Sequence, residues 1–226
     1  MPHARFEAVL FDLDGTLADT APDLNGALND LLASESRPAL PPAILRPHTS
    51  SGTRGMLRVG FNLRPGDDNF PRRAAQFLAI YAQRLCRDTR LFAGMATLLN
   101  ALDHAEIPWG VVTNKPARFT EPLLDALNLS TRAACIVSGD STHNPKPAPD
   151  PLLLGCKIIG CATARTLYVG DDLRDIRAAR AATMPAAAAA WGYLGIDTRI
   201  EDWQADWIVD SPNALLALCE LPLTQT

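Results

Sequence analysis

The chain has 226 residues, which is more than one average domain and less than two, so we expect one core fold that carries an insertion. Hydrophobic residues make up 47% and charged residues 20%, which excludes a chain that is disordered throughout. The net charge is −4 and no dense basic run is present, so nucleic acid is not expected as a partner.

The chain also lacks the signals of export and membrane insertion. Residues 1–7 hold no apolar leader segment, and no run approaches about eighteen consecutive apolar residues. We therefore expect a cytoplasmic protein with no membrane partner, and both a monomer and a homodimer remain open. The cysteines are odd in number and scattered, which favours reduced thiols over a disulfide framework or a zinc site; they are Cys86, Cys135, Cys156, Cys161 and Cys219.

Short apolar runs alternate with segments of helical length along most of the chain. The runs predicted as strands are Ala8–Phe11, Trp109–Thr113, Cys135–Ser138, Thr166–Val169, Ala186–Ala190 and Trp207–Val209. The predicted helices between them are Met95–Ala105, Thr120–Leu127, Pro151–Ile159 and Leu173–Ala182. This alternation predicts an α/β core with a parallel sheet, and it outweighs the helical propensity of the alanine run.

The first two predicted strands are separated by a much longer interval than the later ones. The interval contains a predicted helix after Thr20, loop-like stretches at Ser36–Pro42 and Pro47–Gly55, and a predicted helix at Arg72–Arg87. We interpret residues 22–88 as a small helical subdomain inserted after the first strand, with residues 1–21 and 89–226 forming the core.

The strongest local motif follows the first predicted strand and reads Phe11-Asp12-Leu13-Asp14-Gly15-Thr16. Two carboxylates two residues apart at the end of a strand emerge towards the crevice at the carboxyl edge of a parallel sheet, where ligands usually bind. An Asp-x-Asp-Gly turn can also simply end a strand, so the motif alone leaves both interpretations open.

Further polar residues follow the other predicted strands. Thr113-Asn114 closes one of them, Lys146 lies in a proline-flanked stretch after the next, and the acidic group Asp171, Asp172 and Asp175 follows a third. Carboxylates gathered from two strand ends can share a hard divalent cation with oxygen ligands, so Mg²⁺ is the expected cofactor.

This set of residues suits chemistry on a phosphoryl group. Asp12 can attack phosphorus to give an aspartyl phosphate, and Asp14 is placed to protonate the leaving oxygen and later to take a proton from water. The Thr113 hydroxyl would hold phosphoryl oxygens, while Lys146 and the metal neutralise the charge of the transition state.

In four segments the sequence resembles the haloacid dehalogenase superfamily, in its phosphatase branch; they are Phe11–Thr20, Val111–Lys115, Lys146–Pro151 and Val169–Asp175. The resemblance covers essentially the whole chain and implies a Rossmann-like core with a helical cap. It implies Asp12 as nucleophile, Asp14 as acid and base, and Mg²⁺ held by Asp12, the Asp14 carbonyl and Asp171. Asp175 and Asp172 would lie next to the residues that bind the metal, without binding it directly.

Within that family the chain looks most like phosphoglycolate phosphatases. Trp109–Pro116 and Val169–Ile176 are closer still to N-acetylmuramic acid 6-phosphate phosphatases. In members with a cap, the cap governs substrate choice, so Gly52 and Arg54 are candidates for substrate binding beside Thr113, Asn114 and Lys146. The alternative is a solvated loop with an exposed arginine.

Rival functions share part of this residue set. A phospho-receiver signalling module combines Asp, Thr and Lys with magnesium, but it is about one ordinary domain long and lacks both the insert and an acid two residues after its nucleophile. A dehalogenase needs neither Asp14 nor the second acidic cluster. A phosphosugar mutase of the same superfamily uses the same core and stays open as an alternative to a hydrolase of small phosphorylated metabolites.

Overall fold

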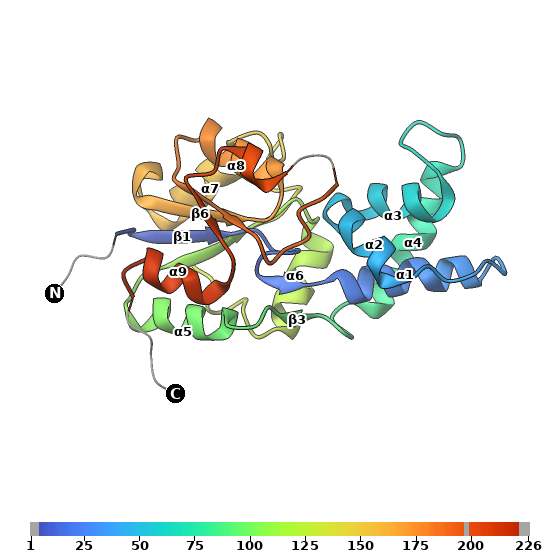
Figure 1. Ribbon diagram of the computed structural model, residues 1–226, viewed down its shortest axis with the longest axis horizontal. Coiled ribbons are helices and arrows are strands. Elements are labelled where there is room, and N and C mark those ends of the chain that lie inside the picture. The colour runs from blue at the N-terminus through green and yellow to red at the C-terminus, as the bar shows by residue number, and fades with distance from the viewer. Residues whose placement is uncertain (1–4, 197–198, 222–226) are drawn as a thin grey trace.

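The structure, a computed structural model, describes residues 5–196 and 199–221 and is built around a parallel sheet (Figure 1). Its six strands are β1 (Ala8–Phe11), β4 (Trp109–Val112), β5 (Cys135–Val137), β6 (Thr166–Gly170), β7 (Ala186–Ala189) and β8 (Trp207–Val209). Their order is β5-β4-β1-β6-β7-β8, and every neighbouring pair is parallel. The α/β fold and the predicted strands are confirmed.

Helices cover both faces of the sheet. One face packs against α5 (Met95–His104), α6 (Ala117–Ala126) and α9 (Pro212–Leu218), and the other against α7 (Asp150–Ile159) and α8 (Leu173–Ala181). Along β1 the side chains of Val9 and Phe11 enter the first core, while Leu10 enters the second. The alanines of β7 alternate in the same way and are all fully buried, so small side chains here face helices rather than water.

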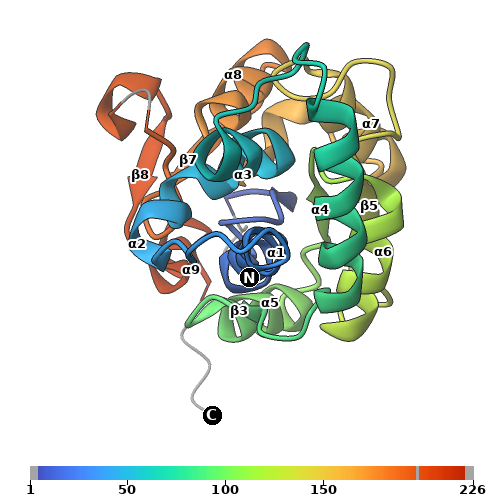
Figure 2. The same cartoon turned by 90° about the vertical axis from the view of Figure 1, so that its right-hand side faces the viewer.

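The long interval between β1 and β4 folds into a separate group of helices, seen at the right in Figure 1 and end-on in Figure 2. It comprises α1 (Ala21–Ala33), α2 (Pro42–Leu45), the 3-10 helix η1 (Arg46–Ser51), α3 (Gly52–Phe61) and α4 (Phe70–Arg84). These helices enclose an apolar cluster of their own that includes Leu28, Met56 and Phe77. A helical insert after the first strand is therefore present.

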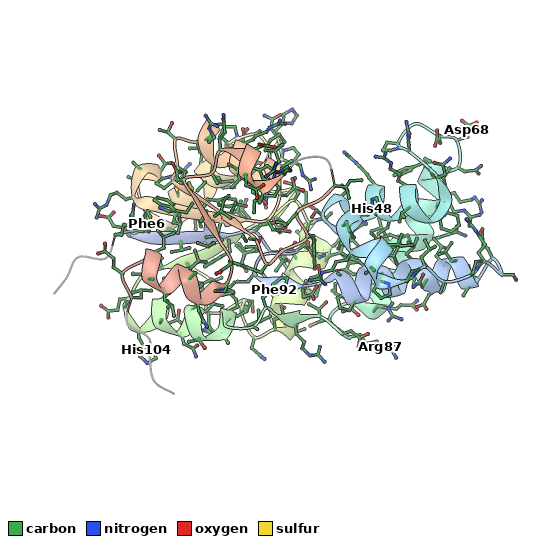
Figure 3. The ribbon with its side chains drawn as sticks, in the orientation of Figure 1. Phe6, His48, Asp68, Arg87, Phe92 and His104 are labelled. Atoms are coloured by element: carbon green, nitrogen blue, oxygen red, sulfur yellow. The ribbon has the colours of Figure 1, made fainter. Side chains whose placement is uncertain are left out.

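The two chain crossings between the insert and the sheet lie side by side. The outgoing β2 (Ala18–Asp19) pairs antiparallel with the returning β3 (Arg90–Leu91). Buried Asp23, in the first turn of α1, accepts hydrogen bonds from the Thr89 N–H (2.9 Å) and hydroxyl (2.7 Å). Phe92, at the junction in Figure 3, packs against Tyr193 with 6.5 Å between ring centroids. Both crossings are thus fixed against the core.

The prediction of a loop over Pro47–Gly55 is wrong, because this stretch forms η1 and the first turn of α3. Proline is tolerated in a first helical turn, where its missing N–H has no intrahelical partner. Gly55 lets the turn close tightly, since a Cβ there would lie 2.1 Å from the His48 carbonyl oxygen. The sequence favours a loop here because prolines, serines and glycines are also the residues of turns.

The remaining elements are short. Two further 3-10 helices, η2 (Thr163–Arg165) and η3 (Ile200–Trp203), precede β6 and β8. Within the described ranges, no helix has the length and apolarity needed to cross a bilayer.

Candidate active site

The carboxyl ends of three neighbouring strands meet at the centre of the sheet. β1 lies between β4 and β6, and the chain leaves these strands at Asp12, Thr113 and Asp171. All three residues are buried and line a cavity of about 800 Å³. The opposite wall is formed by residues of α1, α3 and α4, so the cavity lies between the sheet and the helical insert.

We call the side of the cavity formed by the strand ends at Asp12, Thr113 and Asp171 the floor, and the side that faces the insert the wall. Lys146 is the central cation of the floor. Four oxygen atoms lie within hydrogen-bonding distance of its ammonium group: Asp12 Oδ1 (2.8 Å), Asp175 Oδ1 (2.7 Å), the Tyr168 hydroxyl (2.8 Å) and the Val112 carbonyl (2.9 Å). Burial alone would lower the pKa of Lys146, but the two carboxylates raise it above its ordinary value. A fixed positive charge therefore lies directly beside Asp12.

Three carboxylates form a compact acidic cluster around this cation. One oxygen each of Asp12, Asp171 and Asp175 lies within 4.8 Å of the others. Asp171 accepts from the Thr16 hydroxyl (2.8 Å) and the Tyr193 N–H (2.8 Å). Burial raises the pKa of Asp171 well above its ordinary value, and the charges of Asp12 and Asp175 raise it further.

The cluster fits a divalent metal ion. The Lys146 ammonium group is paired with Asp12 and Asp175, and in the described part of the chain no cationic side chain forms an ion pair with Asp171. Closely spaced carboxylate oxygens with uncompensated negative charge are the ligands that Mg²⁺ prefers. The donor set thus matches a hard cation in both chemistry and charge.

Gly15 makes room for this cluster. Its φ is +90°, and a Cβ there would lie 2.2 Å from Asp171 Oδ2. Both the backbone conformation and the lack of space require glycine at the turn that carries Asp12 and Asp14.

Asp14 has other partners than Asp12, although the two are only two residues apart and line the same cavity. Its Oδ1 accepts from the Thr20 hydroxyl (2.5 Å) and from the Lys115 ammonium group (2.9 Å). The structure therefore separates the two carboxylates of the motif. Asp12 faces Lys146, and Asp14 faces Lys115.

Thr113 and Asn114 line the cavity but differ in what their side chains do. The Thr113 hydroxyl accepts the Lys115 N–H (3.2 Å). Both polar ends of the Asn114 side chain bind the backbone of Lys146: the amide donates to its carbonyl (2.9 Å) and the oxygen accepts its N–H (3.0 Å). Asn114 thus holds the segment that carries Lys146, a contact that the sequence prediction of phosphate binding did not include.

Asp172 and Asp175 begin helix α8 and form a reciprocal N-cap. The Asp172 carboxylate accepts the Arg174 N–H (2.9 Å), and Asp175 accepts the Asp172 N–H (3.1 Å). Asp172 is also paired with the Arg174 guanidinium at 2.8 Å. Burial would raise the pKa of Asp172, but Arg174 lowers it overall. Asp172 therefore lies in an ion pair, whereas Asp175 belongs to the acidic cluster.

The insert contributes the predicted residues Gly52 and Arg54 to the cavity wall. Gly52 has φ +52°, and a Cβ there would meet no atom within 4 Å, so backbone conformation rather than a close approach explains the glycine. Arg174 links this wall to the core, since its guanidinium donates to the Ser50 carbonyl (2.6 Å).

Several site residues were missed from the sequence. Lys115 follows Thr113-Asn114 directly and contacts Asp14, and Thr16 follows the Asp-x-Asp-Gly turn and contacts Asp171. Their positions directly beside the motifs could have identified both as site residues. Tyr81 and Tyr193 carried no such signal, because both come from segments remote in the chain.

Known proteins resemble this chain in sequence and in fold. A model of the haloacid dehalogenase-like hydrolases matches residues 9–189. The chain belongs to this family.

Relatives narrow the class further. The chain is 41% identical over 211 residues to an N-acetylmuramic acid 6-phosphate phosphatase of Pseudomonas putida, covering 93% of this chain and 95% of the relative. It is 44% identical over 211 residues to a phosphoglycolate phosphatase of Xanthomonas campestris, covering 92% and 94%. A crystal structure described as a predicted phosphoglycolate phosphatase from Haemophilus somnus has a TM-score of 0.83 at 28% identity, covering 95% and 98%. The protein is a phosphatase of this family.

Proposed function

We propose that the protein hydrolyses a small phosphomonoester in a Mg²⁺-dependent reaction that proceeds through an aspartyl phosphate on Asp12. The observation that carries the proposal is the position of Asp12, which contacts Lys146 at 2.8 Å and lies in the acidic cluster with Asp171 and Asp175. Asp12, Lys146 and the carboxylates that we propose as metal ligands line one cavity, which supports the proposal.

Mg²⁺ would be held by the side chains of Asp12 and Asp171 and by the Asp14 carbonyl, with Asp175 beside it. When bound, the ion supplies positive charge to the phosphoryl oxygens and to the crowded carboxylates. The excess negative charge of the cluster over Lys146 is the structural support for this assignment.

In the first half of the reaction, a carboxylate oxygen of Asp12 forms a bond to phosphorus and the bond to the ester oxygen breaks. Asp14 gives its proton to that oxygen, which leaves as an alcohol. Lys146 fixes the Asp12 carboxylate through Oδ1 and compensates charge on the phosphoryl group, which the Thr113 hydroxyl helps to hold.

In the second half, Asp14 takes a proton from water, whose oxygen attacks the phosphorus of the aspartyl phosphate. Inorganic phosphate leaves and the Asp12 carboxylate is restored. Asp14 lies on the side of the cavity that faces the insert, since its partner Lys115 lies against Tyr81 of α4.

The insert, residues 22–88, would act as a cap that encloses the substrate. Its helices supply one wall of the cavity, and the Arg174 contact to Ser50 joins the two parts beside the site. Gly52 and Arg54 belong to this wall and are the proposed contacts for the part of the substrate that leaves.

Phosphoglycolate and N-acetylmuramic acid 6-phosphate are the candidate substrates, because relatives carrying those names match the chain over most of its length. A cavity of about 800 Å³ falls in the range that holds ligands larger than a two-carbon acid, which supports a sugar phosphate as well.

The test is phosphate release by the purified protein from a generic aryl phosphate and from a panel of both candidate substrates and hexose phosphates. We expect turnover only with Mg²⁺, and none by Asp12→Asn under the same conditions. Turnover in excess chelator, or retained turnover by Asp12→Asn, would overturn the proposal.

A further inference from the structure

A second buried cation lies in the cavity wall, apart from the catalytic floor. The Lys115 side chain is only 6% exposed, and its ammonium group lies 2.9 Å from Asp14 Oδ1 and 4.8 Å from the centre of the Tyr81 ring. Tyr81 belongs to α4 of the insert, so Lys115 lies where core and insert meet. Burial alone would lower the pKa of Lys115, but Asp14 and then Tyr81 raise it above its ordinary value.

Lys115 has hydrogen-bonding capacity left over. An ammonium group carries three N–H donors; Lys115 Nζ donates one to Asp14, and the Tyr81 hydroxyl is its next polar neighbour, which leaves a donor for a ligand. Lys146 differs in this respect, since four oxygen atoms surround its ammonium group.

Two hydroxyl groups lining the same cavity also lack partners. Across the described part of the chain, the hydroxyls of Tyr81 and Ser50 are shielded from solvent and have no hydrogen-bond partner at ordinary distance, although the Tyr81 hydroxyl lies near enough to Lys115 to interact with its charge. Tyr81 is 2% exposed as a whole residue. Buried polar groups are almost always hydrogen-bonded, so a Tyr81 hydroxyl next to a lysine with a spare donor, and a Ser50 hydroxyl elsewhere in the same cavity wall, indicate a place for a ligand.

The donor character of this wall defines the ligand. Ammonium and hydroxyl groups offer N–H and O–H donors, and an ionised carboxylate offers acceptors alone together with a negative charge. Arg54 adds a further cation to the cavity and has no ion pair in the ranges that the structure describes. In the proposed reaction, Lys146 on the floor compensates the charge of the transferred phosphoryl group, so Lys115 is available to bind a different part of the substrate.

We propose that Lys115 and Tyr81, with the Ser50 hydroxyl, form a subsite for a carboxylate carried by the substrate in addition to its phosphoryl group. The enzyme would then select phosphomonoesters of small carboxylic acids. Lys115 and Tyr81 are specificity residues in this account, which rests on the proposed phosphatase function.

The experiment compares two pairs of substrates that differ in the carboxylate. Phosphoglycolate is paired with ethyl phosphate, and N-acetylmuramic acid 6-phosphate with N-acetylglucosamine 6-phosphate, which lacks the lactyl group. Values of kcat/KM with Mg²⁺ are measured for the wild type, Lys115→Met, Tyr81→Phe and the control Lys157→Met, whose lysine is exposed on α7. The ratio within a pair cancels any effect that a variant has on the chemistry through Asp14.

We expect the wild type to favour the carboxylate member of at least one pair by about tenfold or more, as for a charge-assisted hydrogen bond. Lys115→Met should remove most of this preference, mainly by raising KM for the carboxylate member. Tyr81→Phe should reduce it several-fold, and Lys157→Met should leave it unchanged.

Three results would overturn the subsite. Equal turnover of both members of each pair by the wild type means that no carboxylate is recognised, while the phosphatase proposal stands. Equal losses for both members in Lys115→Met and Tyr81→Phe mean that these residues act through Asp14 or through folding. If the wild type hydrolyses neither pair of substrates and no aryl phosphate, the proposed function is overturned, and the subsite with it. If circular dichroism shows that Lys115→Met does not fold, the test is made with Tyr81→Phe, using the same ratio of kcat/KM values within each substrate pair.

Discussion

The floor and the insert-facing wall of the cavity are built in different ways. On the floor, the Lys146 ammonium group is surrounded by four oxygen atoms, and Asp171 has a hydrogen-bond donor at each carboxylate oxygen. On the wall, Lys115 donates to Asp14 and lies beside Tyr81, and among the described residues the Tyr81 and Ser50 hydroxyls have no hydrogen-bond partner at ordinary distance. The floor is organised before substrate arrives, which is what electrostatic catalysis requires, whereas the wall is completed by the substrate.

The largest effect is expected on the floor, from Lys146→Met. The change leaves the buried carboxylates of Asp12 and Asp175 without their shared cation, so kcat should fall about 100- to 1,000-fold. Breaking a buried ion pair should also lower the free energy of unfolding by about 3–5 kcal/mol. Steady-state kinetics and denaturant unfolding measure the two effects, and a variant with wild-type kcat would contradict the role given to the floor.

Asp14→Asn should reduce kcat by about 100-fold, because the amide neither donates a proton to the leaving oxygen nor takes one from water. The first half of the reaction should suffer less with an aryl phosphate than with an alkyl phosphate, since a phenolate leaves without full protonation. Burst kinetics with both substrates separate the halves. An equal loss with either leaving group in the first half would argue against the acid role.

Asn114→Ala tests how the floor is supported. The side chain makes two hydrogen bonds to the Lys146 backbone, and their loss should lower kcat about tenfold and the free energy of unfolding by about 1–3 kcal/mol. KM should change little if Asn114 acts through Lys146. A rise in KM with unchanged kcat would instead assign Asn114 to substrate binding, as the sequence alone suggests.

The smallest effect is expected on the wall, from Arg54→Ala. Arg54 is exposed and has no ion pair in the described part of the chain, so the free energy of unfolding should stay within about 0.5 kcal/mol of the wild type. KM should change several-fold for some substrates and not for others, at unchanged magnesium dependence. Uniform kinetics across a substrate panel would remove Arg54 from substrate recognition.

The floor was largely predictable from the sequence, and the wall was not. Asp12, Thr113 and Asp171 follow buried strands, and parallel strands bring their carboxyl ends to one edge. Their convergence therefore follows from strand order alone. That argument cannot separate Asp12 from Asp14, because their different partners, Lys146 and Lys115, come from other segments.

The wall depends on packing between helices that local patterns do not specify. Tyr81 occupies an apolar position of α4, and its place over Lys115 results from how the insert docks on the core. The proline, serines and glycines of the η1 and α3 stretch favour turns, while buried Met56 and Leu57 pack it against the other helices of the insert. In such segments, tertiary contacts rather than local sequence determine the secondary structure.

The most direct measurement of the central assignment is chemical trapping of the covalent intermediate. Protein mixed with Mg²⁺ and substrate is quenched in acid within milliseconds, reduced with borohydride and digested for mass spectrometry. Because borohydride converts an aspartyl phosphate to homoserine, we expect that product at residue 12 and none in a sample quenched before substrate is added. Homoserine at residue 14, or turnover with no reduced residue at any quench time, would contradict the assignment of Asp12 as nucleophile.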